Sequence, residues 1–221
     1  MTEHSRVLKL SDCKSPEHNP LLGYELSLFE KGHKVIAGID EVGYGSLAGP
    51  VTVAACILDP SIPVADLKDS KKFSSHKKRS RVAQDIRDSA VAYWIAHRPN
   101  TLIDEIGVVE TLQQAQLECI QNLSVAPDKI LIDGTPYQTL LGLDEEYIVK
   151  GDATVACIAA ASILAKVARD ELMIEFAKEN PDYDYYELES NKGYGSLAHR
   201  NAIKKYGLTP IHRKSYCANL V

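Results

Sequence analysis

The sequence predicts an α/β domain in which a mixed central sheet carries helices on both faces. Two observations support this class. Three strand-like apolar segments occur early in the chain, and shorter ones then alternate with helical patterns. A length of 221 residues suits one domain with a sizeable core. Because ligands in such sheets bind where strands end, the strand ends are the places to search for function.

Each expected strand is a short apolar run that ends in polar or glycine residues. The runs are Val35–Glu41, Val51–Leu58, Ala90–His97, Lys129–Ile132 and Tyr147–Val149. Trp94 is expected to lie in the core of the third strand. The expected helices follow apolar spacing of three to four residues. They are Tyr24–Lys31, Ser75–Asp88, Leu102–Leu123, Ala153–Lys178 and Lys192–Tyr206, and the small residues that open the fourth should allow close packing on the sheet.

Domain organisation follows from the ends of the pattern. Residues 1–33 have mixed polarity and are too short for a domain, so we expect a loosely attached extension. Residues 34–217 form the main domain. The basic segment 207–216 is expected to cap the fold, with DNA contact by His212 and Arg213 as the lower-ranked alternative.

Composition excludes several classes of protein. The net charge of −5 argues against a polyanion binder held by overall charge, although segments 68–81 and 191–221 each carry +6 and could orient a polyanion. The five cysteines form no CxxC pair, which indicates a reducing compartment. The amino terminus lacks an apolar signal region, and the apolar run 153–168 is too short for a bilayer. A cytoplasmic, non-membrane protein is therefore expected.

Four acids share a position at the end of a short apolar strand: Asp40, Glu41, Asp133 and Asp152. Buried acids need a cationic partner, which could be a metal ion or an arginine, unless solvent reaches them. Carboxylates without accompanying His or Cys favour Mg²⁺ or Mn²⁺, and a pair of such ions would support phosphodiester hydrolysis. Each acid alone is more often a cap or a turn residue, so only the joint pattern indicates a site.

Asp40 and Glu41 present a geometric difficulty. Successive residues of a regular strand face opposite sides of the sheet, so both cannot point at one site within regular pleat. We therefore expect Glu41 to lie where the strand has already turned, as the nearby Gly43 would allow.

Several segments resemble, in order and spacing, the bacterial ribonuclease HII family over roughly residues 34–217. They are GIDEVGYGSLAGP (38–50), LKDSKKFS (67–74), ILIDG (130–134), KGDATVACIAAASILAKVARD (150–170), NKGYGSLAH (191–199) and HRKSY (212–216). Ribonuclease HIII shares the fold but usually has a larger amino-terminal domain, which about 33 residues cannot supply.

The resemblance implies an RNase H-like fold with a small helical carboxy-terminal portion. It implies metal-dependent cleavage of RNA in RNA–DNA hybrids and at ribonucleotides embedded in DNA, leaving 5′-phosphate and 3′-hydroxyl ends. The family's metal ligands fall on Asp40, Glu41, Asp133 and Asp152, with Mg²⁺ or Mn²⁺ as cofactor. We expect a monomer.

Substrate contacts are expected at the remaining motif positions, and one departs from the family. The glycines of Gly43-Tyr44-Gly45 would read the ribose, but the family has arginine where this chain has Tyr44. Tyrosine cannot form a charged fork on phosphate, so we expect weaker phosphate affinity there. The other expected contacts are Lys71, Lys72, Tyr194 and His199. Lys166 is expected to pair with an acid near the site.

Two other classes of function compete with the nuclease. One is a nucleic-acid-binding module of the same fold without metals, which the presence of all four acids disfavours. The other is a different nuclease or transposase of the RNase H-like superfamily. That class is distinguished by whether cleavage requires a ribonucleotide.

Overall fold

The structure is a computed structural model that describes residues 20–62, 64, 67, 73, 75–136 and 143–221. Within this part, five strands form one sheet. The strands are β1 (Ile36–Val42), β2 (Val51–Ile57), β3 (Ala92–Arg98), β4 (Lys129–Asp133) and β5 (Glu145–Ile148).

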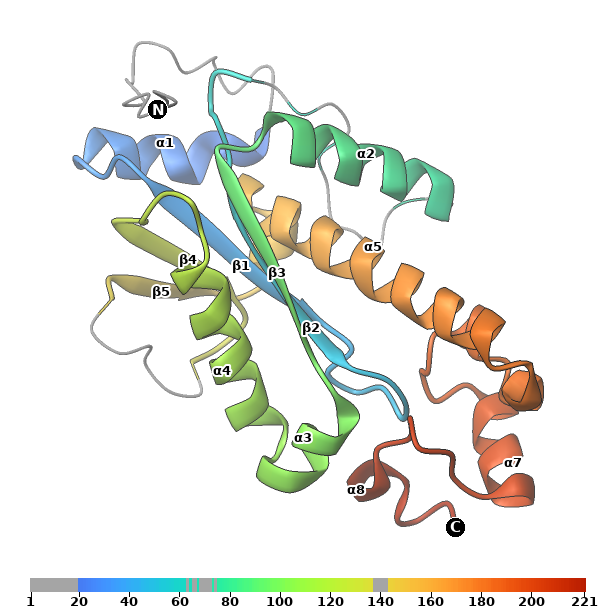
Figure 1. Ribbon diagram of the computed structural model, residues 1–221. Coiled ribbons are helices and arrows are strands. Elements are labelled where there is room, and N and C mark those ends of the chain that lie inside the picture. Colours follow the sequence, from blue (N-terminus) through green and yellow to red (C-terminus); the bar gives the residue numbers. More distant parts are fainter. Residues whose placement is uncertain (1–19, 63, 65–66, 68–72, 74, 137–142) are drawn as a thin grey trace.

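Helices flank both faces of that sheet, and the helices of the carboxy-terminal part lie beyond one end of its strands (Figure 1). The α-helices are α1 (Gly23–Glu30), α2 (His76–Ser89), α3 (Asn100–Ile106), α4 (Val108–Gln121), α5 (Ala156–Glu179), α6 (Leu188–Asn191), α7 (Leu197–Tyr206) and α8 (Lys214–Cys217). Short 3₁₀ turns are η2 (Pro20–Leu22), η4 (Gly151–Ala153) and η5 (Pro181–Tyr186).

The sheet is mixed, as the sequence predicted, with the order β3-β2-β1-β4-β5. β1 pairs antiparallel with β2 and parallel with β4, while β2 and β3 are antiparallel and β4 and β5 parallel. β1 therefore lies at the centre, and its carboxyl end is adjacent to the carboxyl end of β4. This topology brings Asp40 and Asp133 to neighbouring positions.

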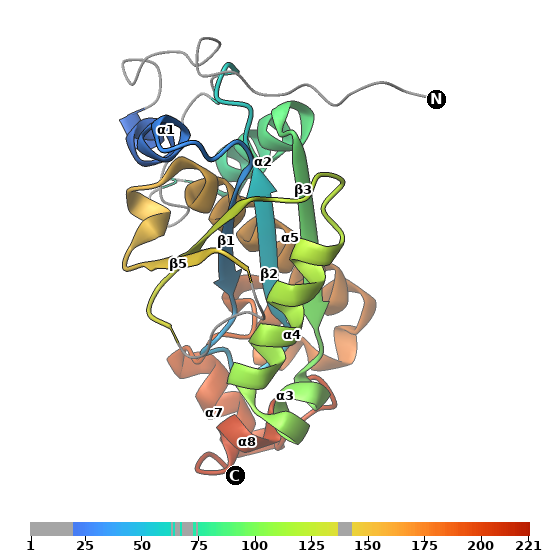
Figure 2. The same cartoon turned by 90° about the vertical axis from the view of Figure 1, so that its left-hand side faces the viewer.

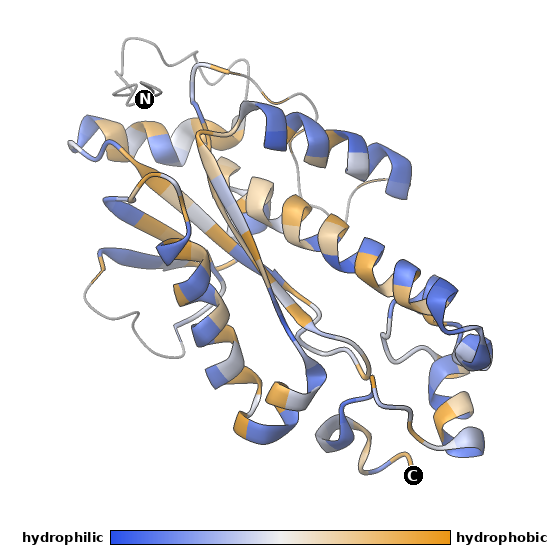
Figure 3. Cartoon of the chain, in the orientation of Figure 1, coloured by the Kyte–Doolittle hydropathy of each residue, from blue (hydrophilic) through white to orange (hydrophobic). Residues whose placement is uncertain are grey.

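Two cores lie on opposite faces of the sheet. Helices α1, α2 and α5 cover one face and α3 and α4 the other (Figures 1 and 2). Figure 3 shows that α2 is largely hydrophilic, whereas the first half of α5 is hydrophobic. That half is buried because it packs directly on β1 and β2.

Close packing of α5 on the sheet is confirmed at Gly38. A Cβ atom at this residue would lie 2.2 Å from the carbonyl carbon of Cys157, so no larger residue fits. The small side chains at the start of α5, predicted to allow such an approach, are fully buried there. The contact fixes the depth of α5 relative to the end of β1.

The extension is not loosely attached in its described part, which corrects our expectation for residues 20–30. Leu22 and Leu28 belong to the core under α5. Glu25 is buried and accepts a 2.7 Å hydrogen bond from the backbone N–H of Cys157 at the start of α5, and Tyr24 donates to Glu146 of β5. Helix α1 is therefore part of the domain.

Three local predictions differ from the structure. The helix predicted over Leu102–Leu123 is broken into α3 and α4 at Gly107, whose φ of +82° interrupts helical geometry. The helix predicted from Lys192 begins only at Leu197. Trp94 is 38% exposed rather than in the core, because β3 is an edge strand and the indole N–H reaches Glu118 on α4 at 3.4 Å.

A third core joins the carboxy-terminal segments to the loop after β1. His212 and Arg213 are buried inside it, which confirms that this tail caps the fold. None of the described helices is long and apolar enough to cross a membrane.

Candidate active site

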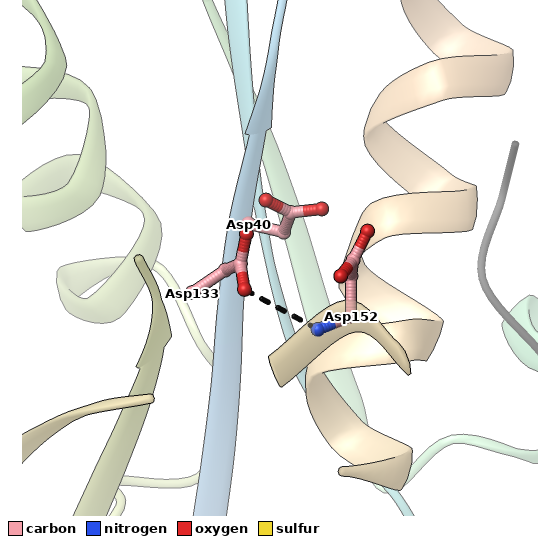
Figure 4. A group of neighbouring side chains, drawn as sticks. All are labelled: Asp40, Asp133 and Asp152. Carbon is pink, nitrogen blue, oxygen red and sulfur yellow. Dashed lines mark hydrogen bonds between the residues drawn. The ribbon is translucent and has the colours of Figure 1, made fainter. Parts of the chain in front are cut away.

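Three of the four predicted acids converge at the centre of the sheet. Each of Asp40, Asp133 and Asp152 offers a carboxylate oxygen, and these oxygens lie within 4.8 Å of one another (Figure 4). Asp40 comes from β1, Asp133 from the end of β4, and Asp152 from the turn η4 that precedes α5. The backbone N–H of Asp152 donates to Oδ1 of Asp133 at 3.3 Å, which fixes two members of the group relative to each other.

Glu41 is not a member of that group, and the expectation about its backbone is wrong. β1 continues to Val42, and Glu41 pairs in regular register with Val53 of β2. Asp40 therefore faces α5, whereas Glu41 faces α4 and lines a small cavity there with Leu112. Glu41 also lines the larger cleft beside Asp40, so it borders the acid group from the other side of the strand.

The electrostatics of the group favour a bound cation. Burial, reinforced by the charges of Glu41 and Asp133, raises the pKa of Asp40 well above its usual range, against a hydrogen bond from Ser162 that lowers it. Among the described residues near this cleft, Lys166 is the lysine that lines it. Converging carboxylate oxygens at this separation suit a hard divalent cation, so the donor set fits Mg²⁺ or Mn²⁺.

A cleft of about 380 Å³ opens over the acids. It is lined by Asp40, Glu41, Val42, Asp133, Ser162, Lys166 and Tyr194. The residues come from β1, β4, α5 and the loop before α7, so the cleft gathers most of the segments that the sequence had singled out.

The ring of Tyr194 lies close to two cations. Nζ of Lys166 and the guanidinium of Arg169 are each 5.0 Å from the ring centroid. Lys166 forms a 2.8 Å ion pair with Asp170, which confirms the predicted pairing with a nearby acid. Tyr194 thus lines the cleft while two cations contact its ring.

The two glycines of the Gly43-Tyr44-Gly45 turn differ in how closely they are packed. Gly43 has a φ of +88°, and a Cβ there would lie 2.3 Å from Nε of Arg169, so glycine is required. A Cβ at Gly45 would meet no heavy atom of the described chain within 4 Å. Tyr44 between them is 39% exposed. The tip of the turn is therefore open to a ligand, and its base is packed.

His199 cannot contact substrate in this structure, which corrects its predicted role. Its side chain is fully buried, and its two ring nitrogens contact the carbonyl of Tyr194 at 2.9 Å and the ring of His212 at 3.0 Å. Lys71 and Lys72, predicted to position phosphate, lie outside the described residues.

The sequence predicts no role for Arg169, and it places Arg213 only in the tail that caps the fold, with DNA contact as the lower-ranked alternative. Both are fully buried and donate to backbone carbonyls of the 44–50 loop. Arg169 stands in one of the family motifs, but nothing local signals its burial. Arginine is usually exposed, and only the packing of distant loops reveals these contacts.

Comparison with known proteins agrees with the geometry. The family model described as Ribonuclease HII matches residues 37–219. A curated Ribonuclease HII of Endomicrobium trichonymphae is 42% identical over 196 residues, covering 89% of this chain and 91% of that protein.

Solved structures share the fold. The ribonuclease H2 from Pyrococcus horikoshii OT3 superposes with a TM-score of 0.69 at 23% identity, over 84% of this chain and 96% of that one. Bst-RNase HIII in complex with Mn²⁺ gives a TM-score of 0.59 at 21% identity, over 78% and 63% of the two chains. With the family model spanning most of its length, the chain belongs to the ribonuclease HII family of ribonucleases H.

Proposed function

We propose that this protein is a metal-dependent endonuclease that hydrolyses the RNA strand of RNA–DNA hybrids. It also cuts on the 5′ side of ribonucleotides embedded in DNA, leaving 5′-phosphate and 3′-hydroxyl ends. The observation that carries this proposal is the convergence of Asp40, Asp133 and Asp152 at a cleft that Glu41, Lys166 and Tyr194 also line. Family membership supports the ribonuclease H class.

We assign Asp40, Asp133 and Asp152 as the ligands of Mg²⁺ or Mn²⁺, with Glu41 at the border of the site completing the set. When bound, the cation would lower the pKa of the attacking water and neutralise charge that develops on the phosphate. Ser162 holds Asp40 through a hydrogen bond, and the N–H of Asp152 holds Asp133. These bonds keep the carboxylates oriented before a cation arrives.

We assign recognition of the ribonucleotide to the Gly43-Tyr44-Gly45 turn, which directly follows the cleft residue Val42, and to Tyr194, which lines the cleft. A glycine, which has no Cβ, lets its backbone groups approach a 2′-hydroxyl closely, and the open position at Gly45 leaves room for a sugar. The ring of Tyr194 offers a surface on which a neighbouring sugar can pack. Lys166, beside that ring, is placed to attract phosphate.

The test is cleavage of a DNA duplex that contains one ribonucleotide, compared with an all-DNA duplex and a long RNA–DNA hybrid. We expect EDTA-sensitive cutting of the first and third substrates, with end analysis showing 5′-phosphate. Equal cutting of all-DNA duplex would instead favour another nuclease of the superfamily. Binding without cleavage, in the presence of Mg²⁺ or Mn²⁺, would favour a non-catalytic module.

A further inference from the structure

We propose that His212 and Arg213, which we call the C-terminal anchor, set the spacing between the two substrate-facing segments and act as positioning residues for ribonucleotide recognition. The two segments are the 43–50 loop and the 191–196 loop. They are far apart in the sequence, yet each is held by one of these two consecutive residues. The inference rests on the proposed function and adds residues to which that function assigned no role.

Arg213 holds the first loop from beneath. Its Nη1 donates to the carbonyl of Tyr44 at 2.7 Å and its Nε to the carbonyl of Gly49 at 3.1 Å. Its backbone N–H donates to the carbonyl of Leu47 at 2.8 Å. The guanidinium is fully buried, whereas the Tyr44 side chain above it is 39% exposed. The buried guanidinium of Arg213 thus fixes the backbone of the 43–50 loop, and the tip of this loop is open to a ligand.

His212 holds the second loop through His199. Nε2 of His212 lies 3.0 Å from Nε2 of His199, and Nδ1 of His199 lies 2.9 Å from the carbonyl of Tyr194. At the other end, the backbone N–H of Thr209 donates to Nδ1 of His212 at 3.0 Å. The chain of contacts leads from the carboxy-terminal segment to the backbone of Tyr194.

The partners of this chain determine both tautomers. The carbonyl of Tyr194 can only accept, so His199 carries its proton on Nδ1. The N–H of Thr209 can only donate, so His212 carries its proton on Nε2. His212 therefore donates to an unprotonated Nε2 of His199, and both rings are neutral. Burial of both rings lowers their pKa values, which agrees with this assignment.

The two loops also contact each other directly. The carbonyl of Gly193 accepts from the N–H groups of Leu47 at 2.8 Å and Ala48 at 3.1 Å. A Cβ at Gly193 would lie 2.3 Å from the carbonyl oxygen of Ala48, so the approach is as close as backbone permits. Arg169 spans the same junction, donating to the carbonyls of Ala48, Pro50 and Lys192.

A shift of one loop relative to the other would break several buried hydrogen bonds at about 1–3 kcal/mol each. The recognition geometry is therefore set by buried polar contacts beneath the cleft. A ligand read jointly by the Tyr44–Gly45 tip and by Tyr194 would lose affinity if this spacing changed. The rate of the chemical step would change less, because the three acids are positioned by β1, β4 and η4 and not by these loops.

The kinetic test uses His212→Leu and Arg213→Lys in the full chain, with His212→Gln as the conservative variant because an amide can still donate to His199. Thr111→Val is the matched control, since it removes a fully buried hydroxyl that donates to the carbonyl of Gly107 at the start of α4, away from the two histidines. For a duplex with one ribonucleotide, we expect KM to rise about 10-fold or more in the first two variants while kcat changes little. His212→Gln should recover most of the loss.

A purely structural role predicts a different result. In that case Tm and the active fraction fall together, kcat decreases and KM stays constant, and this outcome would overturn the proposal. If His212→Leu does not fold, His212→Gln and Arg213→Lys decide the same question. If the wild-type protein fails to cut at a ribonucleotide, the proposed function itself is refuted. Failure of the proposed function can therefore be told apart from failure of the anchor proposal.

A spectroscopic test needs no activity. In ¹⁵N-histidine NMR of the wild-type protein, we expect His199 as the Nδ1–H tautomer and His212 as the Nε2–H tautomer, with nitrogen–nitrogen coupling across their hydrogen bond. The Arg213→Lys variant should keep this signature, and His212→Gln should lose it. Protonation of His199 on Nε2 in the wild type would contradict the anchor.

Discussion

The acid group and the C-terminal anchor both bury charge next to the same cleft, but in opposite ways. Asp40, Asp133 and Asp152 bring like charges together, and burial with neighbouring acids raises the pKa of Asp40. Arg213 instead lies among backbone carbonyls that accept its hydrogens, although burial lowers its pKa to about 10. The acid group offers its oxygens to a ligand, whereas Nε and Nη1 of the arginine are already paired with carbonyls of the protein.

This difference has an energetic consequence. Like charges held together without a cation destabilise the fold, so the acid group should lower stability when no ligand is bound. A buried arginine that bonds to carbonyls stabilises the loops it joins, and removal of its side chain leaves those carbonyls unpaired. The two regions should therefore respond in opposite ways to loss of charge.

The largest expected effect is on catalysis. Asp40→Asn should reduce metal-dependent cleavage by roughly 10²–10³-fold or more, because the amide cannot replace a carboxylate toward a divalent cation. Initial rates with Mg²⁺ or Mn²⁺ on a single-ribonucleotide duplex measure this. Duplex binding should persist, and Asp182→Asn, at an exposed site in η5, serves as the control. Near wild-type turnover of Asp40→Asn would refute the metal-ligand assignment.

Thermal unfolding of the same variant tests the comparison directly. Without metal, Asp40→Asn should keep or raise Tm, because it removes repulsion from the acid group. Arg213→Met should lower Tm by several degrees, at about 2–4 °C for each kcal/mol lost. Equal losses of Tm in the two variants would show that the regions do not differ as described.

A smaller effect is expected where the chain departs from its family. Tyr44→Arg should lower KM for a single-ribonucleotide duplex by about 3- to 10-fold, since a guanidinium adds a charge-assisted bond to phosphate. The anchor should remain intact, because Arg213 bonds to the backbone of residue 44 and not to its side chain. Tyr44→Phe is the control for loss of the hydroxyl. An unchanged or lower kcat/KM of Tyr44→Arg would refute the expectation that arginine at this position improves phosphate binding.

The smallest effect concerns pH. Burial and the neighbouring His199 lower the pKa of His212 from 6.5 to about 4. A histidine with a depressed folded-state pKa contributes stability above its unfolded pKa, and this contribution is lost as pH falls through the folded value. Between about pH 7.5 and pH 5, wild-type Tm should therefore fall more than that of His212→Gln. Parallel Tm curves from the two proteins would show that the histidine pair does not titrate as described.

Several features of the molecule could be predicted from the sequence because they depend on local pattern. The described strands lie within a few residues of their predicted positions, and the strand-end position of each acid indicated where the site would form. The parallel pairing of β1 with β4 then brings Asp40 beside Asp133, as expected for acids at the ends of adjacent strands.

Tertiary structure decided the features that depend on which segments meet. Glu41 faces α4 because β1 keeps its pleat through Val42, so that Glu41 lies in regular strand and not in the turn that we predicted for it. His199 looked like a surface contact, but a turn from the 207–213 segment covers it. Arg169 and Arg213 carry no local mark of burial, since their partners are carbonyls contributed by a loop more than 100 residues away. The sequence shows which hydrogen bonds each side chain can form, and the tertiary structure decides which distant group lies close enough to form them.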